Sequence, residues 1–258
     1  MAVLHVHSYG PRDAPPVLAI HGVTGHGARF RRLATEALGD YHVLAPDLRG
    51  HGHSTWDPPW DAAVHIDDLF ETLAAHDVER CQIVGHSFGG MLATRLAAIA
   101  PDRFERILLL DPAIALAPAK AAQAAADERA DTGWASREEA YAERAAQRPD
   151  HARGVTDEDL DAHIERRPDG RWHFRVDRSA AIVAWSDMAH PLVPLGGYGG
   201  RVLLMAAQQA DFVTPEVIAR LRGDFGDRLE ERPIDVGHML YWDAFDETAA
   251  AMRAFLAT

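Results

Sequence analysis

Short apolar runs alternate with amphipathic stretches over the first 110 residues of the chain. Runs such as Ile107–Leu110 have no polar interruption, which is typical of parallel strands buried on both faces. The runs predict strands at Leu4–Ser8, Val17–His21, His42–Pro46, Gln82–Val84 and Arg106–Leu110. Apolar positions at helical spacing predict intervening helices at Ala28–Leu38, Ala62–His76 and Phe88–Ala100. This alternation predicts an α/β fold, a mostly parallel, doubly wound sheet with helices on both faces.

The alternation stops after Asp111-Pro112. The chain then becomes rich in alanine, arginine and glutamate, with helix signals and few strand signals. Two spacings resemble capping boxes and predict helix starts, Ser136 with Glu139 and Thr156 with Asp159. Further on we predict a short strand around Trp172–Val176 and a helix at Ala180–Met188.

Regular alternation resumes after the glycine-rich stretch 196–200. It predicts a strand at Arg201–Ala206, a helix from Pro215, a strand at Leu229–Ile234 and a final helix ending at Leu256. We therefore predict a core formed by residues 1–111 and 196–258. Residues 112–195 are predicted to form a helical lid, with the glycines as its hinge.

Composition removes several classes of function. The formal net charge of -13 over 258 residues argues against nucleic acid or an anionic membrane as a partner. Cys81 is the only cysteine, so neither an internal disulfide nor a thiolate metal cluster is expected. No leader or membrane-spanning apolar run is apparent, which predicts a cytoplasmic protein. Lys120 is the only lysine, and we attribute this to compositional bias.

The segment from Gly85 to Gly90 carries the strongest chemical signal. An apolar strand leads directly into Gly85-His86-Ser87-Phe88-Gly89, and an apolar-periodic helix follows. A G-x-S-x-G turn between a strand and a helix is a nucleophile elbow, in which glycines permit the tight turn and the serine hydroxyl is exposed at its tip. We predict Ser87 to be a catalytic nucleophile.

A serine hydroxyl needs a base and an acid that orients the base. His238 follows the last predicted strand, at the sheet edge where Ser87 lies, and is our candidate for the base. The acid should come between serine and histidine in the chain. We select Asp211, which follows the strand at Arg201–Ala206, and keep Asp111 at the end of the preceding strand as its rival.

The tetrahedral oxyanion of such a reaction needs backbone N–H donors. One should be the amide of Phe88, directly after the nucleophile. The other should come from the loop His21–Gly25 after an earlier strand, where Val23 is our candidate.

Together these elements resemble the α/β-hydrolase family with a Ser-Asp-His triad. The sequence Asp47-Leu48-Arg49-Gly50-His51-Gly52-His53-Ser54 is also similar to a loop that recurs in this family. The resemblance covers essentially the whole chain and implies a serine esterase or lipase with a helical lid. It implies cleavage of a carboxylic ester of a small, partly hydrophobic molecule through an acyl-enzyme, without a cofactor.

Other activities of this fold stay open from the sequence. Carbon–carbon bond hydrolases, lactonases and cofactor-free perhydrolases share these elements, as does a ligand receptor with slow turnover. Met239 occupies the place of the lysine that hydroxynitrile lyases carry beside the histidine, which disfavours a lyase. The sequence leaves the number of subunits open.

The expected binding residues are mostly aromatic. We predict that Trp134, Trp185 and Met239 contact the substrate. His51, His53 and His86 do not have the converging pattern of a zinc site, so no metal is expected. Nucleotide-binding glycine motifs are absent from the sequence, which gives no support to a nucleotide cofactor.

Overall fold

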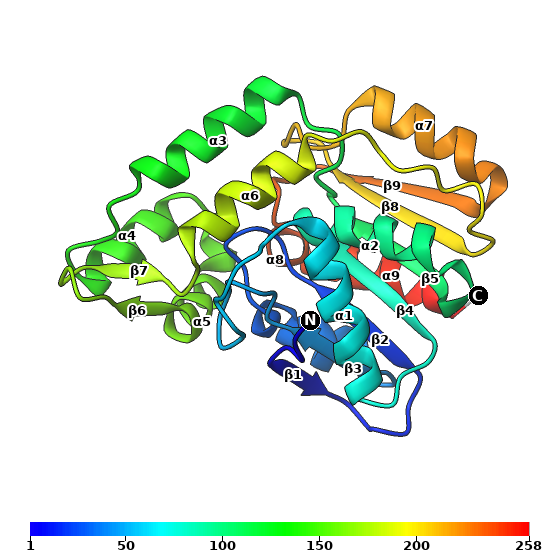
Figure 1. Cartoon of the computed structure of the whole chain (residues 1–258), viewed down its shortest axis with the longest axis horizontal. Coiled ribbons are helices and arrows are strands. Elements are labelled where there is room, and N and C mark those ends of the chain that lie inside the picture. The colour runs from blue at the N-terminus through cyan, green and yellow to red at the C-terminus, as the bar shows by residue number, and fades with distance from the viewer. Residues whose placement is uncertain (258) are drawn as a thin grey trace.

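The computed structural model describes residues 1–257, within which seven strands form one twisted sheet in the order β1-β3-β2-β4-β5-β8-β9 (Figure 1). The strands are β1 (Val6–Tyr9), β2 (Pro16–Ile20), β3 (His42–Pro46), β4 (Cys81–His86), β5 (Phe104–Leu110), β8 (Arg201–Ala207) and β9 (Leu229–Ile234). The edge strand β1 is antiparallel to β3, and every other neighbouring pair is parallel. The predicted fold class is confirmed.

Helices cover both faces of the sheet because successive strand residues point to opposite sides. On β4, Ile83 belongs to one buried cluster and its neighbour Val84 to the other. The Ile83 side is covered by α1 (Ala62–Ala75), α2 (Phe88–Ile99) and α7 (Pro215–Phe225). The Val84 side is covered by η1 (Gly27–Phe30), η2 (Leu33–Ala37), α8 (Leu240–Asp243) and α9 (Phe245–Leu256).

Two local predictions need correction. The chain is helical over residues 27–37, close to the predicted Ala28–Leu38, but the helix is irregular, with a 3-10 turn, η1, at its start and a π-helical turn, η2, at its end. Leu33, Ala34 and Ala37 of this segment are buried in the core. Thr156 does not begin a helix but lies inside one, whereas Ser136 does cap a helix and accepts a bond from the amide of Glu139.

Residues 112–195, which we call the inserted segment, lie between β5 and β8. They contain α3 (Pro118–Ala130), α4 (Arg137–Ala146), η4 (Asp150–Ala152), α5 (Arg153–His163), β6 (Ile164–Arg166), β7 (Trp172–Phe174) and α6 (Arg178–Met188). Helices α3 and α6 lie side by side near the sheet, while α4, α5 and the β6–β7 hairpin project beyond it (Figure 1). This outer part buries a small cluster of its own around Leu160 and Ile164.

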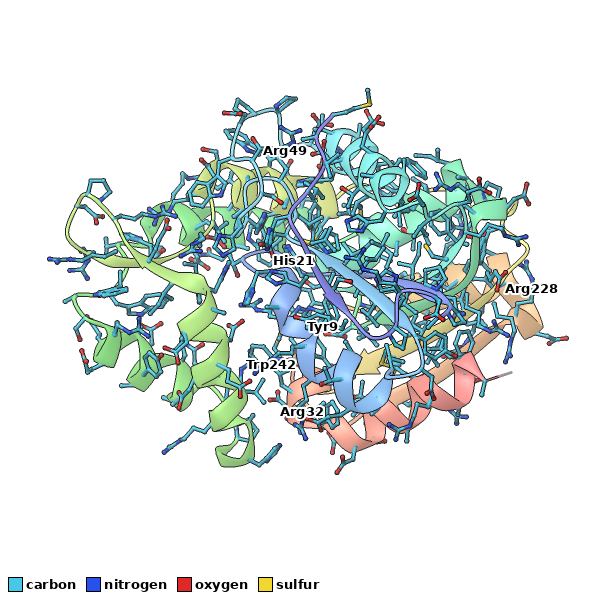
Figure 2. The ribbon with its side chains drawn as sticks, turned by 90° about the horizontal axis from the view of Figure 1, so that it is seen from below. Tyr9, His21, Arg32, Arg49, Arg228 and Trp242 are labelled. Atoms are coloured by element: carbon cyan, nitrogen blue, oxygen red, sulfur yellow. The ribbon has the colours of Figure 1, made fainter. Side chains whose placement is uncertain are left out.

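An ion-pair cluster joins the inserted segment to the core. Asp159 on α5 accepts bonds from both Nε and Nη2 of Arg29, at 2.7 and 3.0 Å, and contacts Nε2 of His26 at 2.8 Å. Burial by itself raises the pKa of Asp159, but Arg29 and His26 outweigh it and hold that pKa well below its usual range. A cavity of about 510 Å³ lies at this junction and is lined partly by Arg29, Asp159 and Trp242. In Figure 2, Trp242 and Arg32 lie where the core meets the inserted segment.

Asp159→Asn is expected to destabilise the protein by about 3–5 kcal/mol, because it leaves the buried Arg29 guanidinium without its counter-charge. The free energy of unfolding, measured by chemical denaturation at pH 7, checks this. The difference should shrink as the pH falls below about 4, where the unfolded chain protonates this carboxyl.

The matched control is Glu158→Gln, which removes the exposed ion pair with Arg31 at the same junction. Its expected cost is below about 1 kcal/mol. Equal losses of unfolding free energy in the two variants would show that the buried Arg29–Asp159 pair does not stabilise this junction more than the exposed pair does.

Within the described residues, no helix combines the length and the apolar character that crossing a membrane requires.

Candidate active site

Ser87 lies at a strained turn between β4 and α2. Its φ and ψ of 55° and -118° are outside the regions that L-residues usually occupy. The surrounding glycines explain how the turn fits. A methyl group on Gly85 would lie 2.4 Å from the carbonyl oxygen of Gly89, and one on Gly89 would lie 2.1 Å from the carbonyl oxygen of Ile20. The chain therefore adopts the elbow geometry that the sequence predicts.

The loop after β2 lies directly against the serine. A methyl group on Gly22 would lie 2.8 Å from Cβ of Ser87, so only glycine fits this approach. His21 orders the loop, since its Nδ1 donates to the carbonyl oxygen of Gly22 at 2.8 Å and its Nε2 accepts from the amide of Leu48 at 2.9 Å. His21 lies at the centre of the view in Figure 2.

The recurring loop at residues 47–54 supports this arrangement. The buried Asp47 carboxylate accepts from the amides of Gly27 and His53, at 2.8 and 2.9 Å. Arg49 makes a bidentate pair with buried Asp68, at 2.7 and 2.9 Å. These bonds hold the loops around Ser87 to the core.

His238 lies in the loop between β9 and α8, at the same edge of the sheet as Ser87. Its Nδ1 is 2.5 Å from Oδ2 of Asp111. The other carboxylate oxygen of Asp111 accepts from the amide of Ala207 at 3.0 Å, so this fully buried side chain is fixed at both oxygens. His86 donates from Nε2 to the carbonyl oxygen of His238 at 3.0 Å. Asp111 thus orients the imidazole of His238, and His86 fixes its backbone.

Asp211, selected from the sequence as the acid, does not contact His238 here. Its side chain is 86% exposed and pairs with Lys120 of α3. The loop after β8 directs Asp211 outward, whereas Asp111 is turned inward at the end of β5 with a φ of 42°. The structure thus brings the rival residue, Asp111, to the histidine.

Burial dominates the electrostatics of the histidine–carboxylate pair. It raises the pKa of Asp111 to about 6. Burial, together with the positive charges of Arg148, Lys120 and Arg29, lowers the pKa of His238 to about 3. At neutral pH the imidazole is therefore uncharged and the carboxylate ionised, which is the state a general base requires.

Of the predicted oxyanion donors, Phe88 directly follows Ser87 in the chain. Phe88 is the first residue of α2, where a backbone amide has no partner inside the helix, and its ring is buried against His65. Val23 follows Gly22 in the loop that touches Ser87. Their role as donors stays a prediction.

The predicted substrate contacts fall in three different places. Trp134 is buried in the cluster of the outer inserted segment and donates from Nε1 to Glu143 at 2.9 Å, away from Ser87. Met239 is buried in the core cluster on the Val84 side of the sheet. Trp185 on α6 lies 6.5 Å from the ring of Phe212, which itself stacks on His238. Of the three side chains, that of Trp185 therefore lies beside a residue that contacts His238.

Potential metal ligands converge away from the serine. Ligand atoms of His5, His7 and Asp47 lie within 4.8 Å of one another, beside β1. His51 and His86 instead make hydrogen bonds to the carbonyl oxygens of Arg49 and His238, at 2.9 and 3.0 Å.

Comparison with known proteins identifies the family. Residues 15–158 match the family model described as the alpha/beta hydrolase fold, so this chain belongs to that family. It is 36% identical over 256 residues to lipase LipV of Mycobacterium tuberculosis, covering 98% of this chain and 97% of the relative. It is 24% identical to esterase YbfF of Escherichia coli, covering 93% and 92%.

Solved structures agree on the fold. E-2-(acetamidomethylene)succinate hydrolase superposes with a TM-score of 0.87 at 20% identity, covering 99% of this chain and 95% of that one. A marine microorganism esterase superposes with a TM-score of 0.80 at 21% identity, covering 99% and 100%.

Proposed function

We propose that this protein is a serine hydrolase that cleaves carboxylic esters of small, partly hydrophobic molecules. The observation that carries the proposal is the His238–Asp111 pair at the sheet edge that presents the Ser87 elbow. The relatives named a lipase and an esterase support ester bonds as the target.

The proposed reaction proceeds through an acyl-enzyme. Ser87 Oγ attacks the ester carbonyl while His238 Nε2 takes its proton, and Asp111 stabilises the resulting imidazolium through Nδ1. The amides of Phe88 and Val23 stabilise the oxyanion. His238 then protonates the leaving alcohol and activates the water that hydrolyses the acyl-enzyme.

Substrate access requires the inserted segment to act as a lid. Ser87 is only 4% exposed in this structure. Helix α6 packs on the core, with Met188 fully buried in the cluster that contains Phe88. We infer that opening of this segment admits substrate and that its return excludes water.

Hydrolysis of p-nitrophenyl esters of increasing chain length tests the proposed function. We expect many turnovers per enzyme, with the preferred chain length reporting the size of the acyl pocket. Stoichiometric binding without turnover would favour a slow receptor. Cleavage of a 1,3-diketone but of no ester would favour a carbon–carbon bond hydrolase.

The pH dependence of kcat/KM is expected to fall on the acid side through about pH 6. Burial raises the pKa of Asp111 to about 6, and the first proton taken up by the His238–Asp111 pair removes the free base. Activity should therefore be full above this pH and decline tenfold per pH unit well below it. An acid limb that persists unchanged in Asp111→Asn would show that another group controls the profile.

A further inference from the structure

The loop between β8 and α7 places an aromatic ring on the face of the proposed base. The ring of Phe212 stacks on the His238 imidazole with centroids 4.0 Å apart and planes 20° from parallel. Asp111 holds one edge of the imidazole at Nδ1. A contact at one edge leaves the His238 imidazole free to tilt about that bond. The Phe212 ring, stacked on the imidazole face, restrains this tilt, which Asp111 does not.

Lys120 of the inserted segment contacts this loop at several points. Lys120, in the first turn of α3, donates from Nζ to the carbonyl oxygen of Asp211 at 3.0 Å and pairs with its carboxylate. The same Nζ lies 3.8 Å from the centroid of the Phe212 ring, in cation–π geometry. The only lysine of the chain therefore contacts two consecutive residues of the loop.

A second residue of the inserted segment lies near the same ring. Trp185 of α6 lies 6.5 Å from Phe212, with its plane 28° from that of Phe212. From the core side, the amide of Gln209 donates to the carbonyl oxygen of Val236 at 3.0 Å, which ties the loop to the segment that leads to His238. The loop is thus held from the lid and from the core at once.

We propose that Phe212 and Lys120 are positioning residues for His238, and that they orient the base only when the inserted segment is seated on the core. This inference rests on the proposed function, in which His238 is the base. Opening of the lid would withdraw Lys120 from Asp211 and release the stacked ring. The base would then be aligned with Ser87 only in the closed, water-excluding state.

An exposed ion pair is the competing explanation of these contacts. Asp211 is 86% exposed, and an ion pair of this kind contributes at most about 1 kcal/mol to stability. If Lys120 contributed only this ion pair, its removal would leave kcat above the acid limb unchanged, although loss of its charge would still shift the limb. The two explanations therefore differ in kinetics rather than in stability.

The sign of the pH effect follows from the charges around the imidazole. The groups that act on the proposed base from neighbouring elements are Asp111, Asp211, His86, Lys120, Arg148 and Arg29. After burial, the positive charges of Arg148 and Lys120 lower the pKa of His238, while Asp211 raises it. Removal of the Lys120 charge should move the acid limb of kcat/KM to higher pH, and removal of the Asp211 charge should move it to lower pH.

The first experiment compares Lys120→Met with Lys120→Arg on a short p-nitrophenyl ester. We expect Lys120→Met to lower kcat about tenfold with KM changed less than twofold, because misalignment of the base affects the chemical step. Lys120→Arg should retain most of kcat, since arginine keeps both the charge and the cation–π contact. Arg129→Met removes one exposed positive charge at the other end of α3 and serves as the matched control.

The second experiment changes the ring itself. Phe212→Ala is expected to lower kcat about 10²-fold, whereas Phe212→Tyr should restore it because the ring is retained. Circular dichroism and thermal unfolding establish that both variants are folded.

The outcomes separate this inference from the proposed function. If the wild type turns over esters and folded Lys120→Met and Phe212→Ala keep the wild-type kcat, the positioning role alone is overturned. Absence of ester turnover in the wild type would overturn the proposed function itself. If Arg129→Met lowers kcat as much as Lys120→Met does, the effect is due to net charge, and the positioning role of Lys120 is rejected.

Discussion

Ser87→Ala is expected to lower kcat for p-nitrophenyl ester hydrolysis by roughly 10⁶-fold, to the residual rate that binding and the oxyanion donors provide. The hydroxyl is the only group at the tip of the elbow that can form the acyl-enzyme in the proposed mechanism. The alanine side chain is smaller and keeps Cβ in place against Gly22, so the fold should persist. Steady-state kinetics with the unfolding temperature recorded in parallel check this.

Covalent labelling provides an independent measurement of the same prediction. A fluorophosphonate should add one equivalent to the wild type, detected by intact mass, and none to Ser87→Ala. Ser8→Ala, which changes an exposed serine on β1, is the control and should label like the wild type. Retention of more than about 1% of kcat in Ser87→Ala would reject Ser87 as the nucleophile.

Asp111→Asn is expected to lower kcat about 10⁴-fold, the order seen when the acid of a serine triad becomes an amide. The amide oxygen can still accept from the amide of Ala207, so the loop should stay in place. Its NH₂ group would then face Nδ1 of His238, which places the ring proton on Nε2. Nε2 would no longer accept the proton of Ser87, and the base would be lost without a change in fold.

Asp211→Asn is the comparison that decides between the two carboxylates. Asp211 is exposed and paired with Lys120, so its replacement should cost less than about tenfold in kcat. The reverse ranking, with Asp211→Asn near 10⁴-fold and Asp111→Asn nearly active, would show that the loop after β8 turns inward during catalysis.

Covalent connectivity and local sterics were enough to predict the elbow. A strand followed by Gly85-x-Ser87-x-Gly89 and an apolar-periodic helix leaves few conformations, because any side chain at the two glycines would collide with nearby backbone. The alternation of apolar runs and amphipathic helices predicted the parallel sheet for a similar reason, since each pattern can bury its apolar face in few ways. His238 was predicted from its place after the last strand of that sheet.

The choice between Asp111 and Asp211 could not be made in this way. Both follow neighbouring parallel strands, β5 and β8, and both precede a turn toward a helix. Which carboxylate points inward depends on packing between elements distant in sequence, namely the bond from Ala207 to Asp111 and the pairing of Asp211 with Lys120. The same limit applies to Trp134, whose burial within the inserted segment was not apparent from its spacing.

The sequence by itself therefore determined the class of fold, the elbow and the position of the candidate base, because these depend on periodicity and on steric limits within short segments. Only the tertiary structure decided which carboxylate lies against His238, and where Lys120 and Phe212 lie. Those placements depend on side chains that meet across separate elements, and the direction of a side chain in a loop is set by its spatial neighbours rather than by its neighbours in the chain.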